Sequence, residues 1–281
     1  MVGLRKRRNS WPVVKANQTN GNGQISATMS NPEHRPEGLQ PDRLTWQVGT
    51  VDSITIETYR VKTLRLRLPN WTSFQPGMHY DVRLTAPDNY QAQRSYSIAT
   101  GPETQGVIDL TVEKIEDGEV SPYLHDELIV GDRIEVRGPI GGAFTWTESM
   151  GGPLLLVGGG SGIVPLMSML RHRDNVARHI QTLLLYSSRT ADDVIYSDEL
   201  AALAEVGHGL QVVHTLTRGM PDDWDGYSRR VDLEMIRNVF DRLGAVGRAF
   251  VCGPQGFVET AANAMIDAGI SSERIRTERF G

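Results

Sequence analysis

The 281-residue sequence contains one cysteine, Cys252, no apolar run of about 18 residues and no paired-histidine motif. One cysteine cannot form an intramolecular disulfide, a four-thiolate iron–sulfur cluster or a multi-cysteine zinc site. Without a long apolar run, no membrane-spanning helix is expected. The seven histidines are scattered and lack H-E-x-x-H spacing, so we expect no protein-bound metal. These absences exclude hydrolytic zinc chemistry and a disulfide-stapled secreted domain.

The first 41 residues differ in composition from the rest. Six Lys and Arg against two Glu give them a net charge of +4, which leaves about −9 for residues 42–281. The polar stretch Gln18–Gln24 and the segment with prolines at 32, 36 and 41 cannot bury enough apolar surface to offset the entropy of ordering. We therefore expect a disordered, solvated tail, with a nucleic-acid or membrane role of its basic cluster as the alternative. No apolar segment of a signal peptide follows Arg8, which favours a cytoplasmic protein. We expect no nucleic-acid partner.

Two folded domains are expected, at 42–148 and 149–281. In the first, short alternating segments such as 61–68 and 107–112 are separated by turn residues, which predicts an antiparallel β-barrel or sandwich, with one helix near 121–128. In the second, strands buried on both faces alternate with helices. The strands are expected at 154–157, 182–186, 212–213 and 249–251, and the helices at 162–173, 195–206, 231–242 and 255–268. This alternation predicts an α/β, doubly wound (Rossmann-like) domain.

A glycine-rich segment, V-G-G-G-S-G-I-V-P at 157–165, follows the first strand of the second domain and opens a helix. Glycines let the backbone approach a diphosphate closely, and a helix N-terminus offers it free N–H groups and a positive dipole. Pro165 stands where a strict G-x-G-x-x-G has its last glycine. The segment favours nucleotide binding, with a tight structural turn as the alternative.

Arginines follow two of the predicted strands. Arg189 comes after Ser188, Arg218 comes after Thr217, and Arg230 lies shortly beyond. Ligands of open α/β sheets lie outside the carboxyl ends of the strands, where an acid binds the ribose of NAD and an arginine accommodates the 2′-phosphate of NADP. With no acid beside these arginines the pattern favours NADP, and solvated surface charge is the alternative.

In the first domain, Arg94-Ser95-Tyr96-Ser97 places a cation and an aromatic ring on one face of a strand. This is the first of six motifs that occur in order: R-S-Y-S at 94–97, G-E-V-S at 118–121, G-P-I-G-G-A-F at 138–144, G-G-S-G-I-V-P at 159–165, V-C-G-P at 251–254 and E-R-F at 278–280. Together they make the segment from about residue 43 to 281 resemble the ferredoxin–NADP reductase family, and more closely its bacterial oxygenase-reductase branch.

The resemblance implies a flavin on the barrel and a nicotinamide nucleotide on the second domain. Arg94 would bind the flavin diphosphate, Tyr96 would stack on the isoalloxazine, and the Ser97 hydroxyl would lie near its N5. The remaining residues of a site for FAD, with FMN less favoured, would be Ser95, Val112, Lys114, Gly118, Val120 and Ser121. The NADP site would comprise Gly160, Ser161, Gly162, Pro165, Ser188, Arg189, Arg218, Arg230, Gly253 and Pro254.

Three further residues match the family's active centre. Cys252 corresponds to a cysteine beside the nicotinamide, and Glu278 to an acid near the reacting atoms. Phe280, where many plant-type members have tyrosine, would cover the flavin ring and be displaced for hydride transfer. With Ser97, these residues form the expected catalytic group. By contrast, we expect His79 within the barrel and His125 and His172 on helix surfaces.

The implied activity is hydride transfer from NADPH (with NADH possible) to FAD, followed by single-electron transfer to a separate acceptor. That acceptor would be a ferredoxin, or a haem or metal-containing oxygenase component, because this sequence lacks the cysteines for a cluster of its own. A diaphorase or free flavin reductase is an alternative enzyme. A non-catalytic flavin-binding electron-transfer subunit is the alternative of another class.

Overall fold

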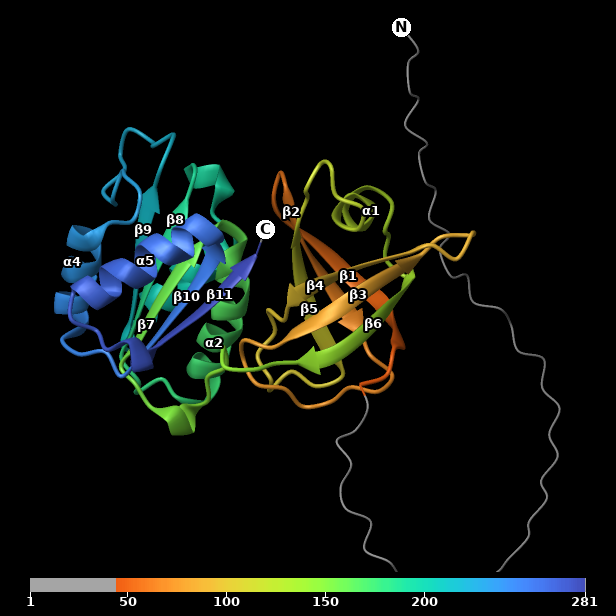
Figure 1. Cartoon of the computed structure of the whole chain (residues 1–281), viewed down its shortest axis with the longest axis horizontal. Coiled ribbons are helices and arrows are strands. Elements are labelled where there is room, and N and C mark those ends of the chain that lie inside the picture. Colours follow the sequence, from red (N-terminus) through yellow and green to blue (C-terminus); the bar gives the residue numbers. More distant parts are fainter. Residues whose placement is uncertain (1–43, 281) are drawn as a thin grey trace, which may run out of the picture.

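An antiparallel barrel makes up the first half of the computed structural model, which describes residues 44–280 (Figure 1). Its sheet has the order β4-β3-β6-β1-β2-β5, and a bridge between Ile98 and Leu110 joins the two ends of that order. The strands are β1 (Gln47–Thr58), β2 (Val61–Arg67), β3 (His79–Thr85), β4 (Gln91–Ser97), β5 (Val107–Glu113) and β6 (Arg133–Ile140). One short helix, α1 (Ser121–Asp126), lies between β5 and β6. The predicted barrel and its helix are confirmed.

Alternating polarity explains why these segments form the barrel. In β2, Leu64 and Leu66 are 1% exposed, whereas the guanidinium-bearing Arg67 lies outside. Leu64 and Leu66 face Leu110 and Ile108 of β5 in the antiparallel register. Apolar side chains of every barrel strand meet in a single core, so the two-residue period of the sequence decides which side faces inward.

The second half is a five-stranded parallel sheet with helices on both faces. Its strand order is β11-β10-β7-β8-β9. The strands are β7 (Leu154–Gly159), β8 (Thr182–Ser188), β9 (Leu210–Leu216), β10 (Arg248–Pro254) and β11 (Ile275–Phe280). The longer helices are α2 (Ile163–Val176), α3 (Ser197–Glu205), α4 (Leu233–Leu243) and α5 (Gln255–Asp267). The predicted doubly wound domain is confirmed, and β11 is a strand that the sequence pattern did not predict.

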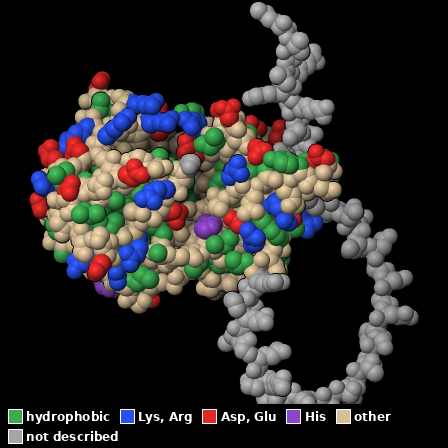
Figure 2. Space-filling view, viewed as in Figure 1, with side chains coloured by type: hydrophobic (Ala, Val, Ile, Leu, Met, Phe, Trp, Pro, Cys, Tyr) green, Lys and Arg blue, Asp and Glu red, His purple; other side chains and the backbone are tan. Residues whose placement is uncertain are grey.

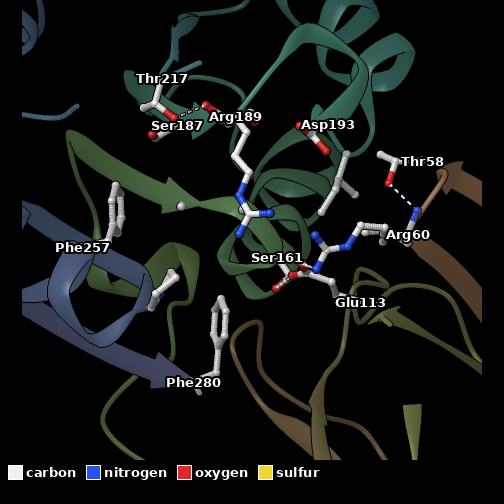
Figure 3. Close-up of a pocket in the computed structure, with 16 residues that line it drawn as sticks. Thr58, Arg60, Glu113, Ser161, Ser187, Arg189, Asp193, Thr217, Phe257 and Phe280 are labelled. Carbon is white, nitrogen blue, oxygen red and sulfur yellow. Dashed lines mark hydrogen bonds and ion pairs between the residues drawn. The ribbon is translucent and has the colours of Figure 1, made fainter. Parts of the chain in front are cut away.

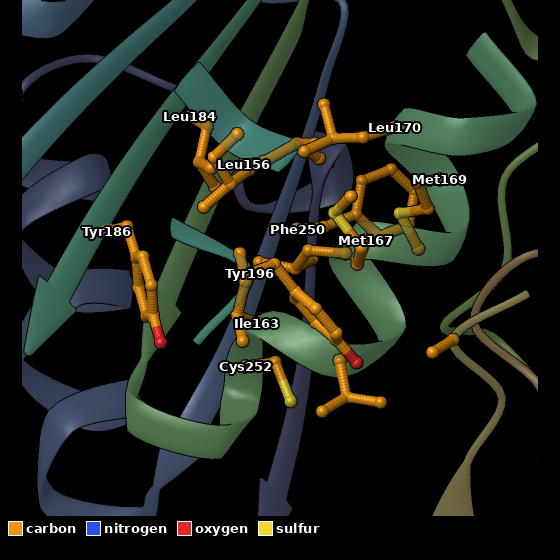
Figure 4. Packing of buried hydrophobic residues seen from close by; sticks show 14 of the residues in the cluster. Leu156, Ile163, Met167, Met169, Leu170, Leu184, Tyr186, Tyr196, Phe250 and Cys252 are labelled. Atoms are coloured by element: carbon orange, nitrogen blue, oxygen red, sulfur yellow. The ribbon is translucent and has the colours of Figure 1, made fainter. Parts of the chain in front are cut away.

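Alternate residues of the parallel strands supply two separate cores. Leu156 of β7 packs with residues of α2 and α3, including Met167 and Leu200. Figure 4 shows this face, with Cys252 and Ile163 at one end of the cluster. Leu155 and Val157 point the other way, into the core covered by α4 and α5. Burial of both faces is why these strands read as continuous apolar runs.

The two domains share buried contacts. Ala99 and Val61 of the barrel belong to the same core cluster as α2, and the Ser168 hydroxyl of α2 donates to the Thr100 carbonyl at 2.7 Å. The buried Tyr196 hydroxyl, just before α3, hydrogen-bonds Thr111 of β5. β11 runs along the second domain to the junction with the barrel (Figure 1). The ends of the parallel strands therefore face residues of the barrel.

The prediction that His125 and His172 lie on helix surfaces is wrong. His125 is 6% exposed and its Nε2 lies 2.8 Å from the Val112 carbonyl, because α1 packs this side of the helix against β5. His172 is 7% exposed because α2 packs against the barrel, and its ring nitrogens contact Glu103 and Glu148. His79 lies on β3 of the barrel, as expected. Contacts between elements distant in sequence bury both helical histidines.

Candidate functional site

The glycine-rich segment lies where the strand order of the parallel sheet reverses. β7 and β10 are neighbours, but their following helices, α2 and α5, cover opposite faces. Crevices for ligands form at such switch points, outside the carboxyl ends of the strands. Gly159–Gly162 follows β7, and Cys252-Gly253-Pro254 ends β10. Two motifs 90 residues apart are therefore brought together, as the family resemblance requires.

Each glycine of this loop is required for a different structural reason. A Cβ on Gly162 would stand 2.1 Å from the Cys252 carbonyl oxygen, so the loop can pack on β10 only without a side chain there. A Cβ on Gly159 would stand 2.8 Å from the Phe257 ring. Gly160 has a φ of +55° and open space where a Cβ would be. The loop thus presents bare backbone toward open space, which fits a ligand whose diphosphate approaches closely.

A pocket of about 220 Å³ opens over this loop, between the two domains (Figure 3). Of the predicted NADP residues, those that line it are Gly160, Ser161, Ser188, Arg189 and Pro254. Phe280 lines it too, and is 38% exposed. Gly162, Pro165 and Gly253 are buried and do not line it. Pro165 occupies the first turn of α2, where its missing N–H has no carbonyl partner to lose.

Of the three arginines predicted for the nucleotide site, one lines the pocket. Arg189 is exposed and extends into it (Figure 3). The Arg218 amide donates to the Arg189 carbonyl at 2.8 Å, so the two strand ends are adjacent as expected. The side chains of Arg218 and Arg230 are exposed but do not line the pocket. Arginine side chains gather along one edge of the second domain in Figure 2, since that domain has no lysine.

The expectation that no acid accompanies these arginines is wrong. Asp193 lines the same pocket. Its carboxylate accepts hydrogen bonds from the backbone amide and hydroxyl of Thr190, at 3.2 and 2.7 Å, in a capping box. Arg189 and this carboxylate line the pocket together, and the carboxylate also caps the local turn.

The residues predicted for the active centre meet at the domain junction. The Ser97 hydroxyl, at the end of β4, donates to Glu278 Oε1 at 3.3 Å. Glu278 is paired with Cys252 in the parallel register of β11 and β10, and Phe280 is paired with Pro254. Cys252 is 1% exposed. Barrel and nucleotide domain therefore contribute to one centre.

Burial sets the electrostatics of this centre. Burial raises the pKa of Glu278 above its ordinary value of 4.5, and the hydrogen bond from Ser97 partly opposes this. Burial, together with the nearby Glu278 carboxylate, raises the pKa of Cys252 well above its ordinary value. The thiol is therefore protonated at neutral pH. Both groups are therefore harder to ionise here than in water.

The predicted flavin residues lie along β4 and the neighbouring turn. Arg94 is exposed, and its Nη2 lies 3.8 Å from the carboxylate of Glu119, within G-E-V-S. Tyr96 is partly buried against the barrel core. The Ser121 hydroxyl accepts from the Ile115 amide at 3.0 Å and closes the turn that opens α1. The two segments predicted to hold the flavin diphosphate are therefore adjacent and are joined by the ion pair between Arg94 and Glu119.

Other members of the predicted flavin set have internal partners. The Ser95 hydroxyl donates to Asp81 at 2.7 Å, and Lys114 lies 2.9 Å from Asp126. Val112 and Val120 belong to the barrel core, at 0% and 1% exposed. In this structure, Ser95 and Lys114 thus have polar partners within the barrel, and Val112 and Val120 pack in its core.

Sequence reasoning missed the barrel side of the pocket. Arg60, in the turn between β1 and β2, and Glu113, at the end of β5, line it together with Thr58 and Val61. Phe257 of α5 also lines it. No local motif marks Arg60 or Glu113, because they reach the pocket only through the docking of the two domains.

Within residues 44–280, no group of three or more His, Cys, Asp or Glu side chains is arranged to hold a metal ion. No helix in that same range is long and apolar enough to cross a membrane.

Comparisons with known proteins match both halves of the chain. The oxidoreductase FAD-binding domain family matches residues 49–146, and the oxidoreductase NAD-binding domain family matches residues 156–263. Ferredoxin–NADP reductase B of Sorangium cellulosum is 33% identical over 214 residues, which cover 74% of this chain and 85% of that protein. The reductase component of propane 2-monooxygenase from Rhodococcus jostii is 31% identical over 217 residues, 75% of this chain and 57% of that protein.

Solved structures share the fold. The ferredoxin–NADP⁺ reductase of Neisseria gonorrhoeae, crystallised with FAD and NADP, superposes with a TM-score of 0.70 at 20% identity and covers 83% of this chain and 98% of that one. The fold and the family matches define a two-domain oxidoreductase with an FAD-binding barrel and an NAD-binding α/β domain. The chain belongs to the ferredoxin–NADP reductase family, as the motifs predicted. It spans 57–65% of the length of the first relatives that it matches.

Proposed function

We propose that this protein is an NADPH-dependent flavoprotein reductase that takes hydride from NADPH and passes electrons singly to a separate acceptor protein. The observation that carries the proposal is the contact between Ser97 of the barrel and Glu278 of the nucleotide domain, beside Cys252 and Phe280. It joins the predicted flavin strand to the predicted nicotinamide pocket at one point. Bound FAD would supply two-electron acceptance and one-electron release, which no side chain provides.

The chain's own residues would bind and orient the two ligands. Arg94 and the turn at Gly118–Ser121 would hold the flavin diphosphate, and Tyr96 would pack against the ring system. Gly160 and Ser161 would hold the dinucleotide diphosphate. Phe280, exposed at the pocket, would cover the flavin ring and exclude water until the nicotinamide takes its place. Holding two ring systems at reacting distance is the main contribution a protein makes to such a transfer.

The choice of NADPH over NADH rests on Arg189. Its side chain extends into the pocket from the end of β8, where a 2′-phosphate on the adenine ribose would be accommodated. Asp193 is held by Thr190, so its carboxylate has hydrogen-bond partners other than a ribose. Arg218 and Arg230 would add positive potential from outside the pocket.

The acceptor would be a ferredoxin or an oxygenase component. The propane 2-monooxygenase relative is named as the reductase component of its system, which supports a separate partner. We further propose that the protein works in the cytoplasm, where NADPH is supplied.

The experiment is anaerobic reduction of the FAD-loaded protein by NADPH and by NADH, followed by the loss of visible flavin absorbance. Fast bleaching by NADPH and slower bleaching by NADH is the expected result. Equal rates would contradict the role of Arg189. Retention of FAD with no bleaching by either nucleotide would replace the proposal with a non-catalytic flavin-binding subunit.

A further inference from the structure

A carboxylate of the barrel is bound to the nucleotide loop of the other domain. The Ser161 hydroxyl donates to Glu113 Oε2 at 2.9 Å, and Arg60 Nη2 lies 3.0 Å from Glu113 Oε1. The Arg60 and Glu113 side chains are 29% and 28% exposed, and all three residues line the pocket. In Figure 3 the Arg60 and Arg189 side chains approach the space above Ser161 from different elements.

The Glu113 carboxylate occupies the place on the glycine-rich loop where an anionic ligand would bind. Ser161 lies in the turn directly before α2, a helix of 14 residues whose N-terminus carries a partial positive charge of roughly half a unit. A hydroxyl and a helix N-terminus are donors that also suit a diphosphate. A diphosphate and a carboxylate cannot share this hydroxyl, because they are like charges and each needs it as the donor.

We propose that the Glu113 carboxylate is an internal competitor for the dinucleotide diphosphate, and that Arg60 is a phosphate-binding residue supplied by the barrel. The inference rests on the proposed function. Binding exchanges the Glu113–Ser161 hydrogen bond for one from Ser161 to the ligand. Arg60 is already near Ser161, because both side chains bind Glu113, and it would then face a phosphate oxygen. The ligand would therefore contact Arg60 of the barrel and Arg189 of the second domain.

This exchange makes affinity for the dinucleotide depend on contact between the domains. With the pocket free of ligand, Glu113 neutralises the anion-binding end of α2 and holds the loop to the barrel. With ligand bound, Arg60 replaces that connection. Glu113 therefore weakens binding of the oxidised product as well as of the reduced nucleotide, which favours product release.

The test uses FAD-loaded protein and NADP⁺, with dissociation constants from calorimetry at low and high salt. Glu113→Gln keeps the shape but removes the charge, and we expect binding to tighten by about three- to tenfold. Glu113→Ser, which shortens the side chain, should act in the same direction. Arg60→Gln should weaken binding about tenfold, and this loss should shrink at high salt because salt screens exposed charges.

The matched control is another arginine–carboxylate pair of the barrel, Asp52 with Arg67, which lies outside the pocket. Asp52→Asn and Arg67→Gln should leave the dissociation constant within about twofold. Equal or weaker binding in both Glu113 variants would overturn the inference.

The outcomes separate this inference from the proposed function. If NADPH bleaches the wild-type flavin but the Glu113 variants bind NADP⁺ no more tightly, the inference fails and the function stands. If the Glu113 variants bind NADP⁺ more tightly but NADPH bleaches the flavin of neither wild type nor variants, the inference is supported and the proposed function is overturned. If neither wild type nor variants bind NADP⁺ and NADPH bleaches none of them, both are overturned.

Discussion

Ser97 and Glu278, 181 residues apart, share a 3.3 Å hydrogen bond across the junction of the two domains. Ser97 ends a strand of the barrel, and Glu278 lies beside Cys252 in the parallel sheet. The bond forms only when both domains are folded and docked. It therefore joins the two halves of the proposed reaction at one point.

Replacing Ser97 with Ala should slow flavin reduction by NADPH about tenfold or more, because the hydroxyl positions a polar group at the reacting centre. FAD binding should persist, since Arg94 and Tyr96 remain. Stopped-flow absorbance measures the rate, and flavin content after gel filtration measures binding. Ser149→Ala, in the exposed linker between the domains, is a suitable control. An unchanged rate in Ser97→Ala would remove this residue from the catalytic group.

Glu278 should make folding stability depend on pH. Its pKa is raised by burial above the ordinary 4.5, so between 4.5 and the raised value the native state holds a proton that the unfolded chain has lost. The free energy of unfolding therefore falls as pH rises through this window, and Glu278→Gln should remove that fall. Urea unfolding at a series of pH values measures the difference between wild type and variant.

That difference should grow with pH above 4.5 and become constant beyond the native pKa. Glu205→Gln, at the exposed end of α3, should give no such trend. A pH-independent difference for Glu278→Gln would show that burial does not raise this pKa.

The single thiol should be nearly unreactive in the native protein. Cys252 is 1% exposed, and burial keeps its pKa well above 9.0, so little thiolate is available. We expect slow labelling by a thiol reagent at neutral pH and complete labelling in denaturant. Because Cys252 is the only cysteine, mass spectrometry reads the result directly. Fast native labelling would contradict the buried position.

Gly162→Ala should destabilise the nucleotide domain by about 1–3 kcal/mol, because the new Cβ would stand 2.1 Å from a backbone oxygen of Cys252. Thermal unfolding measures the loss. The matched control is Gly256→Ala in the first turn of α5, where nothing lies within 4 Å of the added carbon. That variant should be neutral or slightly stabilised. Equal losses in both variants would mean that the loop does not pack tightly on β10.

The fold could be predicted largely from the sequence, because its local patterns agree with its topology. The apolar runs of β7 and β8 and the alternation in β2 each follow from which faces are buried. β11 could not be predicted in this way. Its sequence, I-R-T-E-R-F, carries charged residues at half its positions, because it lies at the sheet edge and pairs with β10 alone.

Residues of the candidate site could be predicted only where they belong to a recognisable sequence motif. Cys252, Glu278 and the glycine-rich loop were expected in the site because they lie in motifs of the family resemblance, and the structure brings them to the junction of the two domains. Arg60 and Glu113 carry none, and they enter the pocket through contact between the domains. His125 and His172 were misplaced for a related reason, since tertiary packing buries polar positions that helix periodicity assigns to the surface.

The most direct test of hydride transfer is a kinetic isotope effect on flavin reduction. FAD-loaded protein would be mixed anaerobically with NADPH, or with NADPH deuterated at the transferred C4 position, and the visible flavin absorbance followed by stopped flow. We predict rapid bleaching that slows with the deuterated nucleotide. No bleaching by NADPH, with FAD still bound, would contradict the proposed reductase activity.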